Sequence, residues 1–232
     1  MRRTLRIAGT LLILAGALTL AWTLVVWQWQ DPFTALYTKW KQHQLTSQYQ
    51  KRVEAFSAPI ATTSLADERR SIAREAKRYR ARSTRGEAIG RIRIPRMGVN
   101  LVLVNGTDHD TLKKGPGRDG RTFMPGENRL IYIAGHRTTY GAPFSHIDRL
   151  HSGDRVTIEV PYGTFIYAVT RHRIVKATDL SVLRSPKHEV VELQACHPRF
   201  FASHRYIAYA RLLRVEPRGA KPYELEAQAS GK

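Results

Sequence analysis

The most informative part of the chain is residues 190–210, which read VVELQACHPRFFASHRYIAYA. Alternate side chains of a strand point to opposite faces of a sheet. In the first run of this stretch, one face therefore carries Val191, Leu193 and Ala195, and the other carries Val190, Glu192, Gln194 and Cys196. The second face is mixed in polarity, which favours an accessible thiol at Cys196 over a buried one.

A second apolar run, residues 205–210, begins at Arg205 after a gap of eight residues. If the two runs are antiparallel neighbours, Cys196 and Arg205 lie opposite or diagonal, with Cβ atoms roughly 5–8 Å apart. Upstream, residues 130–134 read LIYIA, and a continuous apolar run of this length predicts a buried strand. Gly135 and His136 follow directly, so a rigid element presents His136 where the chain leaves it.

These three side chains suit acyl transfer. A thiol attacks a carbonyl as the thiolate, which a nearby cation favours. A histidine can hold the proton and later give it to a leaving amine, and a fixed arginine can stabilise an oxyanion. From the residue types alone, Cys196, His136 and Arg205 are a hypothesis, because the chain has nine histidines and 38 basic residues.

The rest of residues 88–217 predicts an all-β domain. Short β-rich runs alternate with Gly, Pro and Asp turns, which is typical of a barrel or sandwich. The expected strands are residues 88–94, 99–104, 129–134, 155–160, 164–175, 190–196 and 206–215, with short helices or turns near 108–114 and 144–150. We expect the polar tail, residues 218–232, to be disordered.

The N-terminus predicts a membrane anchor in residues 1–30. Three arginines precede an uncharged stretch, and its apolar part, residues 7–27, would span about 31 Å as a helix. Trp22, Trp27 and Trp29 stand where an aromatic belt would lie, and the arginines favour a cytoplasmic N-terminus with the remainder exported. A cleaved signal peptide is the alternative, but its apolar region should be shorter and end in small residues.

Residues 31–87 are interpreted as a helical, basic spacer. Leu36, Trp40, Leu45, Tyr49, Val53 and Phe56 recur at mostly helical spacing, although the step from 40 to 45 breaks the pattern. Residues 57–59 interrupt it, and Ser64 with Asp67 resembles a capping box before a basic helix over residues 65–82. We expect a solvated stalk; the alternative is a helix that touches anionic lipid or wall polymer.

The net charge and the single cysteine restrict which partners, disulfide bonds and metal sites the chain is expected to have. The formal net charge is +19, which implies a polyanionic neighbour or only a soluble surface beside an anionic wall. Cys196 is the only cysteine, so no intramolecular disulfide can form. No paired Cys or His spacing predicts zinc, and no carboxylate cluster predicts calcium, so we expect no metal and no cofactor.

The segments that carry these residues resemble those of actinobacterial class E sortases. The matching stretches are residues 134–144 (AGHRTTYGAPF), 193–200 (LQACHPRF), 205–207 (RYI) and 112–117 (LKKGPG). The order histidine, cysteine, arginine and the spacings also agree. The resemblance covers about residues 88–216, and it implies a sortase-like eight-stranded β-barrel with short helices.

The resemblance also implies a reaction. Sortases cut a sorting signal such as Leu-Pro-x-Thr-Gly, or Leu-Ala-x-Thr-Gly in class E, after the threonine. By this carry-over, Cys196 forms a thioacyl intermediate, His136 acts as general acid and then base, and Arg205 steadies the substrate and the oxyanion. An amine of a peptidoglycan precursor then resolves the intermediate, which fixes a surface protein to the wall. Some members of the family join pilin subunits instead.

Two residues depart from the family pattern. Ala195 and Glu192 stand where threonines are usual, one and four residues before the cysteine. If a threonine hydroxyl helps to organise the oxyanion site, this chain lacks it, so we expect altered specificity or rate rather than inactivity. Tyr140 and Glu192 are candidate substrate-binding residues, and Glu192 could instead pair with an arginine.

Other classes of protein would require different sequence features. A papain-like protease places its cysteine before its histidine, which is the reverse of the order here. An L,D-transpeptidase has a Ser-His-Gly-Cys segment, which is absent. A non-catalytic, membrane-tethered wall-binding barrel would use Cys196 only for packing. Nucleic acid is not an expected partner of an exported domain. The expected partners are proteins with a C-terminal sorting signal, an amine of the wall precursor, and membrane lipid around the N-terminal helix.

Overall fold

The computed structural model describes residues 2–29, 32–56 and 64–225. The elements that carry the argument are four helices and nine strands. They are α1 (Arg2–Trp29), α2 (Pro32–Glu54), α3 (Leu65–Arg82), β1 (Ala88–Ile94), β2 (Val99–Asn105), α4 (His109–Leu112), β3 (Gly117–Arg118), β4 (Leu130–Ala134), β5 (Arg155–Val160), β6 (Gly163–Lys176), β7 (Val190–His197), β8 (His204–Pro217) and β9 (Tyr223–Glu224). Three short 3₁₀ turns are η1 (Pro95–Met97), η2 (Ile147–Arg149) and η3 (Leu180–Leu183).

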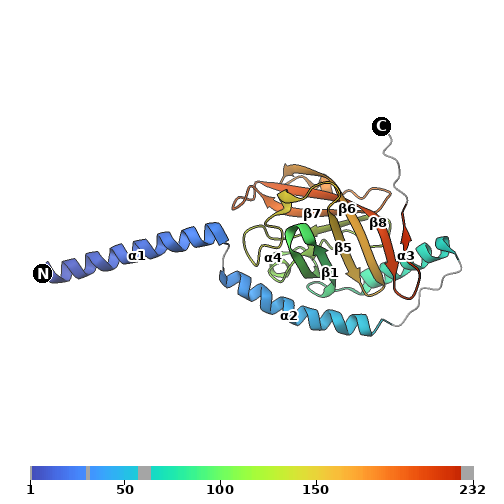
Figure 1. Cartoon of the computed structure of the whole chain (residues 1–232), viewed down its shortest axis with the longest axis horizontal. Coiled ribbons are helices and arrows are strands. Elements are labelled where there is room, and N and C mark those ends of the chain that lie inside the picture. The colour runs from blue at the N-terminus through green and yellow to red at the C-terminus, as the bar shows by residue number, and fades with distance from the viewer. Residues whose placement is uncertain (1, 30–31, 57–63, 226–232) are drawn as a thin grey trace.

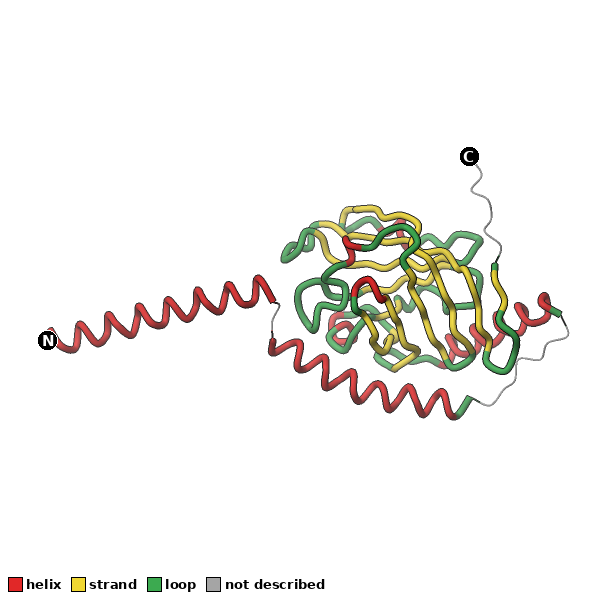
Figure 2. The backbone as a smooth tube through the Cα atoms, in the orientation of Figure 1, coloured by secondary structure: helices red, strands yellow, loops and turns green. Residues whose placement is uncertain are grey.

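Eight of these strands form a closed barrel (Figures 1 and 2). The sheet order is β6-β5-β1-β2-β3-β4-β7-β8, and β6 pairs with both β5 and β8, which closes the ring. Closure leaves no free sheet edge among these strands. The predicted eight-stranded barrel is therefore confirmed. The seven predicted strands match to within two residues at each end, while the two-residue strands β3 and β9 were not predicted.

The barrel interior is apolar and closely packed. From β7 it takes Val191, Leu193 and Ala195, each fully buried in the main core cluster. The predicted division of this strand into two faces is confirmed, because Gln194 and Cys196 on the other face are only partly buried. The core fixes the register of β7, since a one-residue slip would put Glu192 and Cys196 inside.

A second apolar cluster covers the outer face of β4, β7 and β8. It contains Tyr132 and Tyr209 from two of these strands, and Val182 from the segment between β6 and β7. That segment therefore lies over the outside of the barrel rather than projecting into solvent. This arrangement encloses part of the face that carries Cys196.

Helix α2 packs along the outside of the barrel (Figure 1). Its buried residues are Thr38, Gln42, Leu45 and Tyr49. Gln42 joins the helix to strand β2, because its side chain accepts from the Val102 N–H at 2.7 Å and donates to the Val102 carbonyl at 3.1 Å. The predicted apolar stripe is wrong at its start, because Leu36 and Trp40 are exposed. Polar Thr38 and Gln42 take the barrel-facing positions instead, which explains the break in spacing after residue 40.

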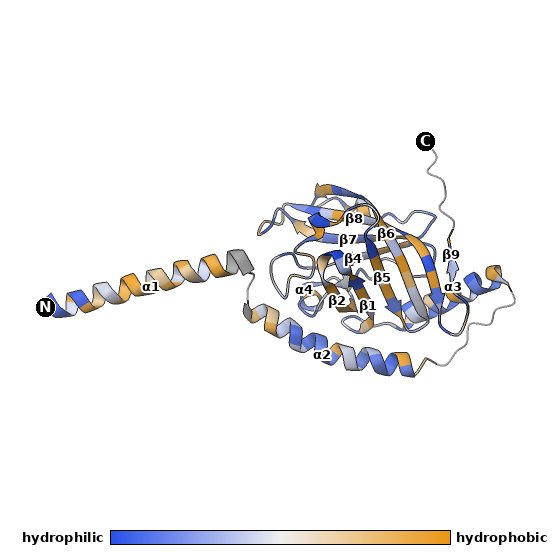
Figure 3. Cartoon of the chain, viewed as in Figure 1, coloured by the Kyte–Doolittle hydropathy of each residue, from blue (hydrophilic) through white to orange (hydrophobic). Residues whose placement is uncertain are grey.

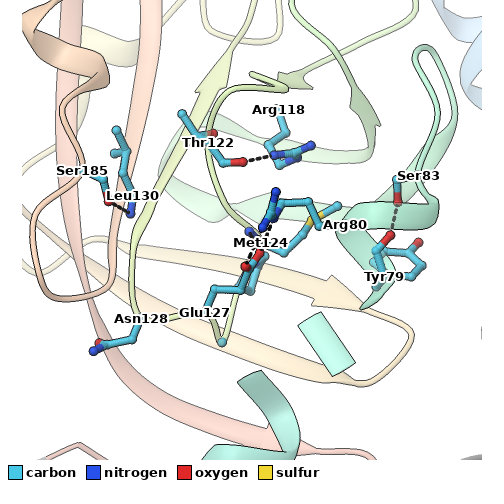
Figure 4. A network of polar contacts seen from close by, with 12 residues as sticks. Tyr79, Arg80, Ser83, Arg118, Thr122, Met124, Glu127, Asn128, Leu130 and Ser185 are labelled. Carbon is cyan, nitrogen blue, oxygen red and sulfur yellow. Dashed lines mark hydrogen bonds and ion pairs between the residues drawn. The ribbon is translucent and has the colours of Figure 1, made fainter. Parts of the chain in front are cut away.

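Helix α3 also packs on the barrel, and Figure 4 shows its Arg80 beside Glu127 from the connection between β3 and β4. Ile72 and Ala76 are fully buried in the main core. Arg80 forms an ion pair with Glu127, with Nε–Oε1 2.8 Å apart. The helix begins as predicted, since the Asp67 N–H donates to the Ser64 hydroxyl at 3.1 Å. The expectation of a solvated stalk, made for this basic helix, is wrong, because Ile72 and Ala76 on one of its faces are buried in the main core.

The two ends of the chain differ. The tail was expected to be disordered, but Tyr223 and Glu224 form β9 and pair with β8, which corrects this expectation for residues 218–225. Residues 226–232 lie outside the described part of the chain, as do the predicted break at 57–59 and the side chains of Trp27 and Trp29.

Helix α1 is long and apolar enough to cross a membrane over Arg2–Val25, and Figure 3 shows its apolar character.

Candidate active site

The strand order places His136 beside Cys196. Strand β4 runs parallel to β7, with Ala134 opposite Gln194. The Gly135 N–H still donates to the Gln194 carbonyl at 3.0 Å, so the two chains are joined up to the point where β4 ends. His136 follows at once, next to the end of β7 that carries Cys196. The prediction that a rigid strand presents this histidine agrees with the geometry.

Arg205 lies on the other side of Cys196. Strands β7 and β8 are antiparallel, and Cys196 pairs directly with Arg205 in their register. The antiparallel arrangement assumed from the sequence is therefore confirmed. Neighbouring strands are about 4.8 Å apart, so β4, β7 and β8 bring the three candidate side chains together from positions distant in the sequence.

His136, Cys196 and Arg205 line one pocket on the outside of the barrel. Leu112 forms part of its apolar wall, together with Val182 and Leu183 from the segment between β6 and β7. The pocket therefore combines a thiol, an imidazole and a guanidinium with apolar surface, which is typical of a site that binds a peptide and fixes its orientation with few polar groups.

The His136 imidazole is partly buried. Burial lowers the pKa of this group, and the charges of His109 and Lys113 lower it further. Within the described residues its Nε2 atom has no hydrogen-bond partner. A Cβ at Gly135 would lie 2.7 Å from the Phe144 ring, so glycine is needed for the close approach that precedes the histidine. The imidazole is thus held beside the pocket, with its Nε2 atom buried and without a hydrogen-bond partner among the described residues.

The backbone of Cys196 is held by Arg137. The Arg137 side chain is 4% exposed, and its Nη1 donates to the Cys196 carbonyl at 3.2 Å and lies 2.9 Å from the Nδ1 of His197. Its Nη2 forms an ion pair with Asp148 at 3.1 Å. Sequence analysis did not single out Arg137, which stands next to His136 and joins the histidine segment to the cysteine strand.

Arg205 is partly exposed and is oriented by the loop before it. Its Nη1 donates to the carbonyls of Ala202 and His204, at 2.7 and 3.0 Å. These bonds leave Nε and Nη2 without a hydrogen-bond partner within the described residues. A guanidinium with free donors beside a thiol can bind a carbonyl oxygen or a carboxylate.

The two candidate substrate-binding residues lie outside the pocket lining. Glu192 is 5% exposed and stands between Tyr132 and Tyr209 in the strand registers. Burial raises the pKa of Glu192 to about 7, although Arg171 opposes the shift. One carboxyl oxygen, Oε2, has no hydrogen-bond partner among the described residues. Among the described residues no arginine forms an ion pair with this carboxyl group, so the structure does not support the arginine pairing that the sequence left as one alternative.

Ala195 points into the barrel and is fully buried in the main core. A threonine at this position would face the interior, not the pocket that contains Cys196. The substitution therefore bears on core packing more directly than on an oxyanion site.

Sequence analysis also missed Asp119 and Arg121, which line the pocket from the segment after β3. Arg121 binds the Asp119 carboxylate with both Nε and Nη2, at 2.9 and 2.7 Å. Burial raises the pKa of Asp119, but the bonds from Arg121 outweigh it, and the net pKa lies below the usual range. This segment has no strand or motif pattern in the sequence, so nothing there indicated a site.

Comparison with known proteins relates this arrangement to one family. A family model described as the sortase domain matches residues 92–213. Sortase D of Bacillus subtilis strain 168 is 35% identical over 131 residues, which are 54% of this chain and 64% of that protein. The matched region thus spans less than two thirds of the length of this relative.

Several solved structures resemble the fold, and two of them are sortases of classes D and E. A Clostridium perfringens sortase D5 transpeptidase aligns with a TM-score of 0.61 and 25% identity, over 75% of this chain and 98% of that one. Sortase E1 from Streptomyces coelicolor, solved with a tripeptide in its active site, aligns with a TM-score of 0.53 and 25% identity. That alignment covers 57% of this chain and 92% of the other.

Proposed function

Because this chain belongs to the sortase family, we propose that it is a membrane-anchored cysteine transpeptidase that uses Cys196 as nucleophile, His136 as acid and base, and Arg205 to bind the substrate carbonyl. The observation that carries the proposal is the shared pocket of these three side chains at the ends of β4, β7 and β8. The order and chemistry of the three residues match the family pattern described from the sequence.

The first half of the reaction forms a thioester. The Cys196 thiolate attacks the threonine carbonyl carbon of the sorting signal, and the electron pair moves to the carbonyl oxygen. The free Nε and Nη2 donors of Arg205 stabilise this oxyanion. The threonine–glycine bond then breaks, and the His136 imidazolium gives its proton to the leaving amine. A histidine with a lowered pKa is a comparatively strong acid once it is protonated, which suits this step.

The second half transfers the acyl group. An acceptor amine attacks the thioester carbonyl, neutral His136 takes the amine proton, and the thiolate leaves as the new amide forms. We propose that the acceptor is the amine of a peptidoglycan precursor, so that the product is a surface protein joined to the wall. Water in place of the amine would give hydrolysis of the same thioester.

The substrate is proposed to be a Leu-Pro-x-Thr-Gly or Leu-Ala-x-Thr-Gly signal. The apolar wall of Leu112, Val182 and Leu183 suits an aliphatic side chain upstream of the threonine. Glu192 and Tyr140 do not line the pocket, so we assign them indirect roles. Glu192 lies beside Tyr132, which lines the pocket, and would influence which signal is preferred through the position of that ring.

Class E remains our proposal for this chain, on the residue segments quoted above. A class D assignment is the alternative, and it has an observation in its favour: the relative named sortase D is 35% identical, and the D5 structure gives the higher TM-score of the two solved structures described. Relative rates with the two signal peptides would bear on this choice.

We propose that α1 crosses the cell membrane once, with its N-terminus in the cytoplasm and the barrel outside. The support is the apolar stretch Arg2–Val25, in which no residue is buried, together with the N-terminal arginines. Cysteine accessibility labelling on intact cells, with single cysteines placed at residue 3 and residue 220 of a Cys196→Ala chain, tests this topology. Labelling of residue 3 from outside would contradict it.

The activity test uses the detergent-solubilised full chain with both peptides and triglycine as acceptor. We expect cleavage between threonine and glycine, and a ligated product whose yield rises with triglycine concentration. Cys196→Ala, which removes only a partly buried thiol, serves as the control. If the wild-type chain cleaves neither peptide, or if Cys196→Ala cleaves as well as the wild type, the proposed function is wrong.

A further inference from the structure

The turn that follows His136 has a strained backbone. Tyr140, Gly141 and Ala142 all have positive φ, at 53°, 69° and 38°. Glycine adopts this conformation freely, but for other residues it is energetically unfavourable. A strained conformation of this kind persists only where the surroundings hold it. The question is which contacts hold Tyr140.

Much of the support comes from the start of helix α2. The Tyr140 N–H donates to the Thr34 hydroxyl at 2.9 Å, across 106 residues of sequence. The Tyr37 ring packs edge-on against the Tyr140 ring, with centroids 6.4 Å apart. A Cβ at Gly141 would lie 3.7 Å from Thr38, so the turn rests directly on the helix. The first two turns of α2 therefore contact the turn on its backbone and on its ring.

The Tyr140 ring in turn packs on the His136 imidazole. The two ring centroids are 5.1 Å apart and the rings are inclined by 37°. His109 packs edge-on against both rings, at 6.4 Å from His136 and 6.3 Å from Tyr140. Tyr140 is not part of the pocket lining that contains Cys196. Its contacts are those of a residue that orients the imidazole, not of one that binds substrate.

We propose that Thr34 and Tyr37 are positioning residues for catalysis: they hold the Tyr140 turn so that its ring keeps His136 directed at the pocket of Cys196. The inference rests on the proposed function, because it assigns the role through His136. Helix α2 begins at Pro32 and α1 ends at Trp29, so the proposed positioning residues lie in the segment that follows the candidate membrane helix.

A purely structural role is the alternative, in which α2 only covers the barrel. The two roles separate along the helix, because Leu45 and Tyr49 pack on β1 and β2, away from the histidine segment. Leu45→Ala weakens this docking without touching Tyr140. It is therefore the matched control for Thr34→Val and Tyr37→Leu.

The kinetic test uses the full chain in detergent with a Leu-Pro-x-Thr-Gly peptide. Thr34→Val and Tyr37→Leu are expected to lower kcat about tenfold with KM nearly unchanged, since small displacements of a catalytic group have effects of this size or larger. Thr34→Ser keeps the acceptor and Tyr37→Phe keeps the ring, so these variants should restore most of kcat. Leu45→Ala should lower the Tm and leave kcat as in the wild type.

A second measurement does not depend on activity. NMR titration of the histidine ring signals in a Cys196→Ala chain gives the pKa of His136, which a His136→Gln spectrum assigns. Burial under the Tyr140 ring contributes to the lowered pKa, so Thr34→Val and Tyr37→Leu should raise it, and Leu45→Ala should not. The charged groups that face the site are His109, Lys113, Asp119, Arg121 and Arg205, and they are the same in every variant.

The outcomes are distinct. The inference is overturned if Thr34→Val and Tyr37→Leu leave both kcat and the pKa of His136 unchanged, or if Leu45→Ala changes them equally. A wild-type chain that cleaves no sorting peptide would refute the proposed function instead. The titration would still decide whether α2 positions the imidazole.

Discussion

The two faces of strand β7 have opposite characters within eight residues. The inner face, Val191, Leu193 and Ala195, is fully buried in the barrel core. The outer face carries Glu192, Gln194 and Cys196, of which the last two line the candidate active site. Inner side chains fix the register of the strand, and the register fixes where Cys196 stands. Stability and chemistry are therefore separable on one strand, and substitutions on the two faces should give different results.

The largest effect is expected on the outer face. Cys196→Ala removes the nucleophile, so peptide cleavage should fall by at least about a thousandfold. The thiol is only partly buried, and we expect the free energy of unfolding to change by less than about 1 kcal/mol. Peptide assays and urea denaturation of the same preparations check both statements. A large loss of stability would mean that Cys196 belongs to the packed core after all.

Arg205→Lys should have the next largest effect. Lysine keeps the positive charge but lacks the planar fork whose Nε and Nη2 are free to bind the substrate oxygen. We expect kcat/KM to fall by about a hundredfold, as for the loss of one oxyanion donor. Arg211→Lys on the same strand is the control, because Arg211 pairs with Val190 far from the pocket. Equal losses in the two variants would argue against a specific role for Arg205.

The inner face should respond in stability instead. Leu193→Ala leaves a cavity in the barrel core, which costs about 2–5 kcal/mol of unfolding free energy. Well below the new Tm, kcat should remain close to that of the wild type. Urea titrations and peptide cleavage at 10 °C measure the two quantities. A variant that stays stable but loses activity would break the proposed separation of the faces.

Glu192 combines a feature of each face of β7, because it lies on the outer face but is buried. Its ionisation should therefore affect stability. Its folded pKa of about 7 exceeds the ordinary 4.5, so the folded state holds its proton more tightly than the unfolded state. Stability from this group is therefore lost as pH rises from about 4.5 to about 7, by about 3 kcal/mol at most.

Glu192→Gln cannot ionise and keeps the shape of the side chain. Relative to this variant, the wild type should become progressively less stable across the same pH range. Glu189 also has a raised pKa of about 7, but it is present in both chains, so the difference isolates Glu192. Urea denaturation at pH 5, 6, 7 and 8 gives the comparison. A difference that does not vary with pH would show that Glu192 is already hydrated or paired.

The sequence predicted this strand well because its pattern is local. Alternation gave the two faces of β7, and the apolar run before His136 gave β4. The antiparallel pairing that brings Arg205 opposite Cys196 was assumed for two strands separated by a short gap, and the register confirms it. These features depend on near neighbours in the sequence, so composition and period are enough to predict them.

Such local patterns could not predict contacts between polar groups that are far apart in the sequence. The barrel-facing side of α2 was wrongly assigned because Thr38 and Gln42 reach their positions by bonding backbone groups, a feature that hydrophobicity does not register. Arg137 and Asp119 each depend on partners that the fold brings together from separate loops. Strand β3 was missed because a strand of two residues is too short to show an alternating pattern of polar and apolar side chains.

The most direct test of the account is intact-protein mass spectrometry after the full chain is mixed with a Leu-Pro-x-Thr-Gly or Leu-Ala-x-Thr-Gly peptide and quenched in acid. We predict an added mass equal to the peptide acyl group ending at threonine, located on Cys196, released by hydroxylamine and absent in Cys196→Ala. The absence of any adduct while the peptide is cut, or an adduct that persists in Cys196→Ala, would contradict the account.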